Sequence, residues 1–387
     1  MNKSISKSLD RRIENKIPFD SLSTKNKKII IKDLQKYYKN KNMISNNSNH
    51  ILYTILCRDY IINNKNKCLK INNENNIIIG DNIKIDSIIK DNTESGLVCT
   101  ASFININPKL SAINKFYIKI IKNNVEDTEL KVLEFIRRIF INSCPHFPLL
   151  YGYLKCNDIY TSYDNYPKFI KKNPENIILL IEAAKGTYDD FYKKHYNNNN
   201  LILNTLIQIY LSLMFFYNYI QSFHVDCHSG NYLYYKVDDN YGYYHYIING
   251  IDYYLKNTGY IFVIWDFDMI LPFDNSNSFL TTKKLKRMDI TRDFYEILDF
   301  FINNNEDEDS SKRNGEIDSQ YKFNDEINRI TDNLNHLLID YKNENKHNDI
   351  NNLRELENLL LNSLSINTEI FTTLKPGNII NNTPFII

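Results

Sequence analysis

The sequence predicts an α+β chain in two parts, a strand-rich part followed by a mainly helical part. Short apolar runs separated by polar residues begin at residue 77, which is the pattern of strands. Longer apolar segments with helix-like character follow residue 186. The chain has 387 residues, 43% of them hydrophobic, so it can bury a large core in one two-lobed unit or in two domains.

The overall charge, the cysteines and the first residues indicate which partners and which cellular compartment to expect. The formal net charge of +1 gives no bulk attraction to nucleic acid or to a membrane surface, so we expect neither as a partner. The six cysteines are scattered and form no C-x-x-C pair, which indicates free thiols in a reducing compartment. The first residues are polar, so we expect no secretory signal and a cytoplasmic protein.

One segment, residues 201–223, has the length and the lack of charge of a membrane-spanning helix. However, Asn204, Gln208, Asn218 and Gln221 interrupt its apolar character. We therefore predict that this segment is a buried core helix.

Residues 1–75 are rich in Lys and Asn, and we interpret them as an N-terminal extension. Short helices are predicted at residues 29–38 and 51–62, and no chemical motif lies there.

Residues 76–183 predict a small domain with a five-stranded sheet and one helix. The helix is expected at residues 129–140, where apolar side chains recur at helical spacing. The apolar runs that predict strands are residues 77–79, 83–89, 97–103, 116–121, 147–154 and 177–181.

Residues 184–387 predict a larger, mainly helical domain, joined to the first through a link at residues 182–186. An insertion at residues 238–259 contains two strand-like runs on either side of Asn249-Gly250, which is a strong signal for a type I′ hairpin. Residues 303–320 are charged and rich in Ser and Asn, so they predict a mobile loop. Amphipathic helices are expected at residues 324–341 and 351–364.

The pattern H-x-D-x-x-x-x-N, from His224 to Asn231, is the centre of the chemical interpretation. An apolar run follows it at residues 260–265 and ends in Asp266. Asp226 is suited to orient an acceptor hydroxyl and to accept its proton. Asn231 and Asp266 supply oxygen ligands of the kind that magnesium prefers. Together they form the base-and-metal set that phosphoryl transfer requires.

In this order the motifs resemble those of the protein-kinase-like superfamily, with its H-R-D-x-x-x-x-N catalytic loop and D-F-G metal site. The resemblance covers about residues 77–300. With the segment Cys-Pro-His-Phe-Pro-Leu-Leu-Tyr-Gly-Tyr at residues 144–153, the chain looks like the kinase-like proteins of giant DNA viruses of the mimivirus type. The resemblance implies a two-lobed protein-kinase-like fold, ATP and magnesium as cofactors, and a place in the host cytoplasm or the virion.

The resemblance also implies roles for residues of the first domain. Lys119, in Phe-Tyr-Ile-Lys, matches the V-A-I-K lysine that contacts the α- and β-phosphates. Glu129 matches the glutamate that pairs with this lysine, and Glu134 is a rival on the same predicted helix. Gly96 and Val98 match the end of the phosphate-covering loop, and Glu182 lies at the link beside the nucleotide.

Several positions depart from the family pattern. The phosphate-covering loop has Asp91 and Thr93 where the family has glycines, and Tyr117 replaces a small residue on the strand that carries the lysine. These changes are expected to weaken nucleotide binding. Val225 replaces the Arg that pairs with a phosphorylated activation loop, so we expect no switching by that route.

Two further departures concern the catalytic loop and the metal site. His228 stands where protein kinases usually have Lys, as it does in aminoglycoside- and choline-type kinases. Asp268 stands where D-F-G has Gly, which puts the usual metal geometry in doubt. No A-P-E-like triplet lies between residues 268 and 293, and Asp293 begins a segment that resembles the helix anchoring the catalytic loop.

Three functions are compatible with these residues. The leading one is phosphoryl transfer from ATP to a protein Ser/Thr hydroxyl, and the second is a catalytically inactive pseudokinase that acts as a binding scaffold. The third is a small-molecule kinase, favoured by His228 and by the missing A-P-E. A zinc-hydrolase site from His224, Asp226 and His228, with Cys227 as a soft ligand, competes for the same loop. However, no second His/Cys cluster in the sequence completes four ligands.

Overall fold

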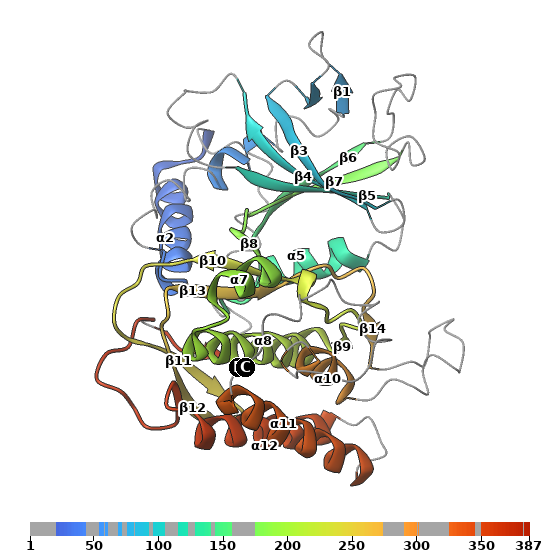
Figure 1. Ribbon diagram of the computed structural model, residues 1–387. Coiled ribbons are helices and arrows are strands. Elements are labelled where there is room, and N and C mark those ends of the chain that lie inside the picture. The colour runs from blue at the N-terminus through green and yellow to red at the C-terminus, as the bar shows by residue number, and fades with distance from the viewer. Residues whose placement is uncertain are drawn as a thin grey trace. The chain divides into compact units, whose positions relative to one another are not determined.

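A computed structural model of the chain combines helices with several antiparallel sheets (Figure 1). The residues that the structure describes are 21–43, 54–57, 59–60, 69–71, 76–80, 82–92, 96–104, 115–122, 128–140, 144–156, 175–273, 290–299, 301, 325–344, 350–381 and 383–387. The predicted mobile loop at residues 303–320 lies outside them.

The chain divides into two compact units. It passes from unit 1 to unit 2 for the last time between Ala183 and Ala184. This is the position at which the sequence predicted the change from the small to the large domain. Unit 1 contains Met1–Lys39, Met43–Asn142 and Pro148–Ala183, and unit 2 contains Asn40–Asn42, Ser143–Phe147 and Ala184–Ile387.

Two short segments belong to unit 2 although the sequence assigned them to the extension and to the small domain. The Asn42 side chain donates hydrogen bonds to the Asp238 carbonyl oxygen, at 2.6 Å, and to Asn240. The His146 ring bonds to the Phe262 carbonyl oxygen at 2.8 Å and to the Tyr246 hydroxyl at 2.9 Å. These partners are distant in sequence, so no local pattern indicates them.

Unit 1 is built on a seven-stranded antiparallel sheet in the order β1-β2-β3-β4-β5-β7-β6. The prediction of five strands is wrong, because all six apolar runs of residues 76–183 form strands of this sheet and a seventh strand from the N-terminal extension is added at one edge. The strands are β1 (Leu69–Ile71), β2 (Ile77–Ile79), β3 (Ile83–Asn92), β4 (Gly96–Phe103), β5 (Phe116–Lys122), β6 (Leu150–Cys156) and β7 (Asn176–Ile181).

The central strand β5 shows how the sheet divides its two faces. Phe116, Ile118 and Ile120 alternate along one face and are fully buried. The Phe116 ring packs on Phe103, which in turn contacts the Tyr60 ring. Side chains between these positions, including Lys119, point to the opposite face.

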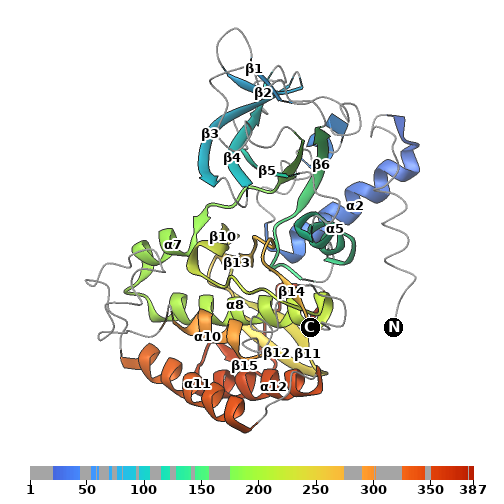
Figure 2. The same ribbon diagram turned by 90° about the vertical axis from the view of Figure 1, so that its right-hand side faces the viewer.

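Unit 1 also contains two long helices. Helix α5 (Thr128–Phe140) was predicted almost to the residue, and it contacts β6 (Figure 2). Helix α2 (Thr24–Asn40) belongs to the extension, and all of it except Asn40 lies in unit 1. Its Tyr38 is fully buried and bonds to Thr54 at 2.9 Å. This helix is longer than the predicted helix at residues 29–38.

Helix α8 (Asn199–Ile220) is the core helix of unit 2. It is long and apolar enough to cross a membrane, yet 89% of its most apolar window is buried inside the protein. Two of the amides that interrupt its apolar pattern bond to the backbone of neighbouring strands: Asn204 donates to the Lys256 carbonyl oxygen, and Gln208 accepts from the Phe262 N–H. The prediction of a buried core helix is confirmed.

The other helices of unit 2 pack around α8. Helices α10, α11 and α12 lie beyond α8 on one side, with α10 contacting both α8 and α11 (Figures 1 and 2). Their bounds, with that of the shorter α7, are α7 (Tyr188–His195), α10 (Arg292–Leu298), α11 (Asp325–Glu344) and α12 (Ile350–Asn367).

A three-stranded antiparallel sheet carries the C-terminal end of the loop described below. Its order is β13-β10-β8, with β8 (Gly186–Thr187), β10 (Tyr232–Lys236) and β13 (Tyr260–Ile264). Strands β9 (Ser222–Phe223) and β14 (Leu271–Pro272) form a separate antiparallel pair.

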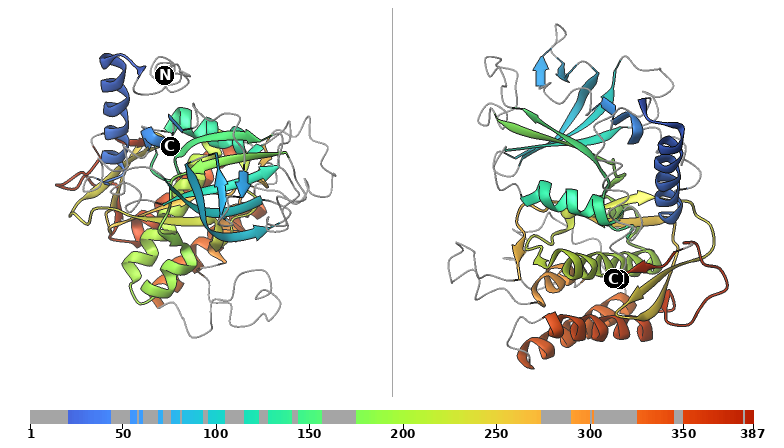
Figure 3. Two further views of the ribbon diagram at one scale, coloured as in Figure 1. Left: turned by 90° about the horizontal axis from the view of Figure 1, so that it is seen from above. Right: turned by 180° about the vertical axis from the view of Figure 1, so that it is seen from behind.

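The predicted hairpin insertion is present as β11 (Tyr243–Ile248) and β12 (Ile251–Lys256). Asn249 and Gly250 both have positive φ, 50° and 84°, which is the backbone of the predicted type I′ turn. The C-terminal strands β15 (Phe371–Thr372) and β16 (Phe385–Ile386) pair with its two edges (Figure 3). The sequence did not predict this pairing.

Candidate functional site

Lys119 and Glu129 form a buried ion pair in unit 1. The Lys119 Nζ lies 2.8 Å from Glu129 Oε1 and 2.7 Å from Oε2. The two side chains are 2% and 1% exposed. Glu134, the rival partner, lies instead near Arg137 at 3.8 Å. The structure therefore brings together the pair that the sequence favoured.

The sheet register determines what surrounds this pair. Val98 on β4 is directly opposite Lys119 on β5, so both side chains lie on the same face. Gly96 begins β4 with φ +142°, and a Cβ there would lie 2.9 Å from the Ile120 carbonyl oxygen. The close approach of β5 therefore requires a glycine at this position, independently of any phosphate.

Glu182 directly follows β7 and is buried in unit 1. Its Oε2 accepts hydrogen bonds from the Tyr37 hydroxyl and from the Leu149 N–H, both at 3.4 Å. Its own N–H donates to the Leu149 carbonyl oxygen at 2.9 Å. The carboxylate that the sequence assigned to nucleotide binding thus contacts the N-terminal helix α2.

In unit 2, the residues of the H-x-D-x-x-x-x-N pattern lie on a loop between β9 and β10. Helix α8 ends at Ile220 and is capped by Gln221, whose left-handed backbone (φ 55°) turns the chain into β9. The loop closes with a single 3₁₀ turn, Ser229–Asn231. Strand β10 then pairs with β13, and the Trp265 N–H donates to the Asn231 carbonyl oxygen at 3.1 Å. The backbones of Asn231 and Asp266 are therefore neighbours.

Asp226 is held by two side chains of its own loop. The Asn231 Nδ2 donates to both Asp226 Oδ2 and the Asp226 carbonyl oxygen at 2.9 Å. The His228 Nε2 lies 3.5 Å from the same Oδ2. The hydrogen bond from His228 is the main cause that lowers the pKa of Asp226, and Asn231 adds to it. Asp226 is thus an ionised, half-exposed carboxylate.

The residues expected to hold magnesium present oxygen atoms, which fits a hard cation. Both hydrogen bonds of the Asn231 amide nitrogen go to Asp226, so its carbonyl oxygen is directed away from that residue. Asp266 has a left-handed backbone, φ 64°, and is 9% exposed. The buried Phe267 that follows stacks on Phe216 of α8 at 5.5 Å, which anchors this turn of the chain.

His224 is fully buried and serves the packing of the loop. Its Nε2 lies 3.1 Å from the Trp265 carbonyl oxygen, so Nε2 carries the hydrogen. Burial lowers the pKa of His224 to about 4, although the nearby Asp266 and Asp226 oppose this. The imidazole is therefore neutral at physiological pH.

The zinc alternative does not gain support from this arrangement. In the described part of the chain, His224, Asp226 and His228 do not form a group whose ligand atoms all lie within 4.8 Å of one another, although His228 and Asp226 are themselves close. Since a zinc site needs its ligands at bonding distance from one ion, these three residues do not form one.

The backbone of the loop is anchored by Asp293 on α10. The fully buried Asp293 carboxylate accepts from the His224 N–H at 2.7 Å and the Val225 N–H at 3.1 Å. The Tyr217 hydroxyl donates to it at 2.7 Å. Burial raises the pKa of Asp293 to about 6. Val225 has φ 71°, a strained conformation for a β-branched residue.

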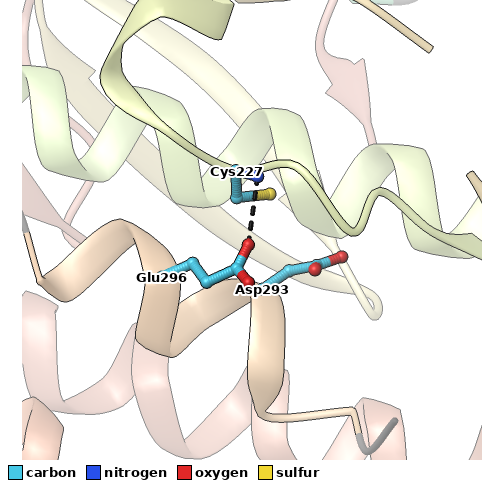
Figure 4. A group of neighbouring side chains, drawn as sticks. All are labelled: Cys227, Asp293 and Glu296. Carbon is cyan, nitrogen blue, oxygen red and sulfur yellow. Dashed lines mark hydrogen bonds between the residues drawn. The ribbon is translucent and has the colours of Figure 1, made fainter. Parts of the chain in front are cut away.

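A second carboxylate on α10 extends this anchor (Figure 4). The Glu296 Oε2 accepts from the Cys227 N–H at 3.1 Å, and Arg292 donates to Glu296 Oε1. Burial raises the pKa of the Cys227 thiol well above its usual range, so the sulfur is protonated. With both carboxylates occupied by backbone N–H groups, we interpret this cluster as an anchor for the loop.

Sequence reasoning identified Asp293 but missed Glu296, Tyr217 and His146. The i, i+3 spacing of Asp293 and Glu296, which places both on one face of a helix, was the available signal for Glu296. The other two bond to residues 76 and 100 or more positions away, for which the sequence has no local signal.

Comparison with known proteins identified no related protein. No protein-family model matches the chain, and no curated protein matches it at a significant level.

Proposed function

We propose that this protein has a two-lobed protein-kinase-like fold and transfers a phosphoryl group from ATP, with magnesium, to a protein Ser/Thr hydroxyl. The observation that carries the proposal is the arrangement in unit 2. There Asn231 and His228 hold the ionised Asp226, and Asn231 lies next to the chain segment that leads from β13 to Asp266. A base and two oxygen ligands on adjoining chain segments are what such a transfer requires.

Each residue then has a defined role. Asp226 orients the acceptor hydroxyl and accepts its proton. Asn231 and Asp266 hold magnesium, which neutralises charge on the phosphates when it is bound. Lys119, kept in position by Glu129, contacts the α- and β-phosphates, with Gly96, Val98 and Glu182 as further nucleotide-binding residues.

Thermal unfolding with ATP, in the presence and absence of magnesium, tests the binding part. ATP that binds only the folded protein raises the unfolding free energy by about 2.7 kcal/mol at about 100 times its Kd. We expect the rise only with magnesium, and we expect Asp266→Ala to abolish it. Asp252→Ala, an exposed carboxylate on the hairpin, is the control and retains the shift.

The chemical step is tested with Asp226→Asn. This variant retains ATP binding and loses transfer activity by about 10²-fold or more, since it lacks the proton acceptor. Full activity in Asp226→Asn contradicts the role of Asp226. Protein substrates are tested first in the transfer assay, because the leading proposal is transfer to a protein hydroxyl.

Two other functions have observations in their favour. The second candidate is a pseudokinase scaffold that binds a partner protein. It is favoured because the close approach of β5 is enough to require a glycine at position 96, so Gly96 by itself does not indicate a phosphate-covering loop. If ATP did not change the unfolding temperature under any condition, that result would favour the scaffold.

His228 beside Asp226 favours a small-molecule kinase of the aminoglycoside or choline type, and phosphoryl transfer to small acceptor molecules would identify it. As the resemblance to giant-virus proteins implies, we place the protein in the host cytoplasm or the virion.

A further inference from the structure

The imidazole of His228 is in contact with two parts of its own loop. Its Nδ1 accepts a hydrogen bond from the Gly230 N–H at 3.1 Å. A backbone N–H can only donate, so Nδ1 is unprotonated and the neutral ring carries its hydrogen on Nε2. The contact caps the 3₁₀ turn that ends in Asn231.

The other ring nitrogen is directed toward the carboxylate of Asp226. Nε2 lies 3.5 Å from Asp226 Oδ2, the oxygen that also accepts from Asn231. Two donors therefore converge on Oδ2. Within the described residues no hydrogen bond to Asp226 Oδ1 is found, which leaves this oxygen for an acceptor hydroxyl.

Gly230 has a specific reason to be a glycine. A Cβ at this position would lie 2.9 Å from His228 Cε1 and 3.1 Å from Nδ1. The first distance is too short for a methyl group beside a ring that cannot move without losing its hydrogen bond. The ring of His228 therefore occupies the space that a side chain at position 230 would need.

From these contacts we propose that His228 is a positioning residue, held as the Nε2–H tautomer by Gly230 and orienting Asp226 so that Oδ1 faces the acceptor. One ring thereby couples the orientation of Asp226 to the turn that places Asn231. The catalytic consequence rests on the proposed phosphoryl transfer, whereas the tautomer and its dependence on Gly230 do not.

The first test is the tautomer, measured by long-range ¹H–¹⁵N spectra of the full chain with labelled histidine at alkaline pH. His228→Ala assigns the signal, and His245→Ala on the hairpin is the control. We expect the wild type to show the Nε2–H form and Gly230→Ala to lose it, because the added methyl displaces the ring. A wild-type signal from the Nδ1–H form, or an unchanged signal in Gly230→Ala, overturns the proposal.

The second test separates the two contacts by kinetics. His228→Asn retains a side-chain oxygen that can accept from the N–H two residues on, yet it is too short to reach Asp226. We expect His228→Asn to lower kcat about tenfold with little change in the KM for ATP, and His228→Ala and Gly230→Ala to lower it further. Equal kcat values in His228→Asn and the wild type overturn the orienting role.

Failure of the proposed function would look different from failure of this inference. A wild type without transfer activity, but with the Nε2–H signal that Gly230→Ala removes, rejects phosphoryl transfer and supports the coupling of His228 to the loop. An active wild type in which Gly230→Ala keeps both the signal and the kcat rejects the inference and leaves the proposed function standing.

Discussion

The candidate residues of unit 1 and those of unit 2 are held in place by different means. Lys119 and Glu129 are almost fully buried and neutralise each other across 2.7 Å. Asp226, in contrast, is half-exposed, and the backbone beside it is held by N–H groups that donate to Asp293. In unit 1 the charged Lys119 side chain is held by the opposite charge of Glu129. In unit 2 the Asp226 carboxylate is positioned by a loop whose backbone N–H groups bond to Asp293. Substitutions are therefore expected to act differently in the two regions.

The largest effect is expected from breaking the buried pair. Lys119→Met leaves the Glu129 carboxylate buried without a partner, which costs about 3–5 kcal/mol of unfolding free energy. Replacing both residues, as in Lys119→Met with Glu129→Leu, removes both buried charges and is expected to recover most of that loss. Urea unfolding of the single and double variants measures both values.

Glu134→Gln is the matched control for this experiment, because its partner Arg137 is 3.8 Å away and both side chains are partly exposed. It is expected to change the unfolding free energy by less than about 0.5 kcal/mol. A double variant as unstable as Lys119→Met alone would contradict the explanation by burial.

The second-largest effect is expected at Asp293, which holds the backbone of the loop, and it depends on pH. Burial raises the pKa of Asp293 from 3.8 to about 6, so the folded protein binds this proton more tightly than the unfolded chain does. The group therefore contributes stability in full below about pH 4 and loses it as the pH rises through 6, by roughly 3 kcal/mol.

Asp293→Asn removes this titration, so the wild type gains stability relative to the variant as the pH falls from 7 to 4. Unfolding free energies of both proteins at intervals across that window provide the measurement. A constant difference between the two proteins would show that the Asp293 carboxylate is already solvated or titrates elsewhere.

The smallest effect is expected at the strained residue next to Asp226. Val225 adopts φ 71°, which costs a residue with a side chain about 1–2 kcal/mol, and glycine avoids this cost. Because glycine also loses more entropy on folding, Val225→Gly is expected to be neutral or to stabilise by about 1 kcal/mol.

Val237→Gly is the matched comparison, since this buried residue is not among those with positive φ. It is expected to lose about 2–4 kcal/mol through the cavity and the added flexibility. Equal destabilisation by the two substitutions would show that Val225 is not strained.

Much of the local structure followed from the sequence. The strand runs of unit 1, helix α5 and the type I′ hairpin were predicted close to their final bounds, because each depends on side-chain periodicity or on one turn. The choice of Glu129 over Glu134 as the partner of Lys119 is also borne out by their contact. The number of strands was underestimated, since all six apolar runs of residues 76–183 form strands and the short strand β1 (Leu69–Ile71) adds a seventh.

What the sequence by itself determined is the order of the local elements and the residues that lie next to each other on them. Asp226 and Asn231 meet because they are only five positions apart on one loop. The family resemblance already pointed to Asp293 as an anchor of that loop, whereas only the tertiary structure showed the second anchor, Glu296, and decided which strands complete each sheet. Asp293 and Glu296 reach the loop from about 70 residues away, and Phe371–Thr372 and Phe385–Ile386 pair with a hairpin more than 100 residues earlier. The strand pairings use backbone N–H and C=O groups, which do not depend on the side chain, so they leave no pattern of side chains in the sequence.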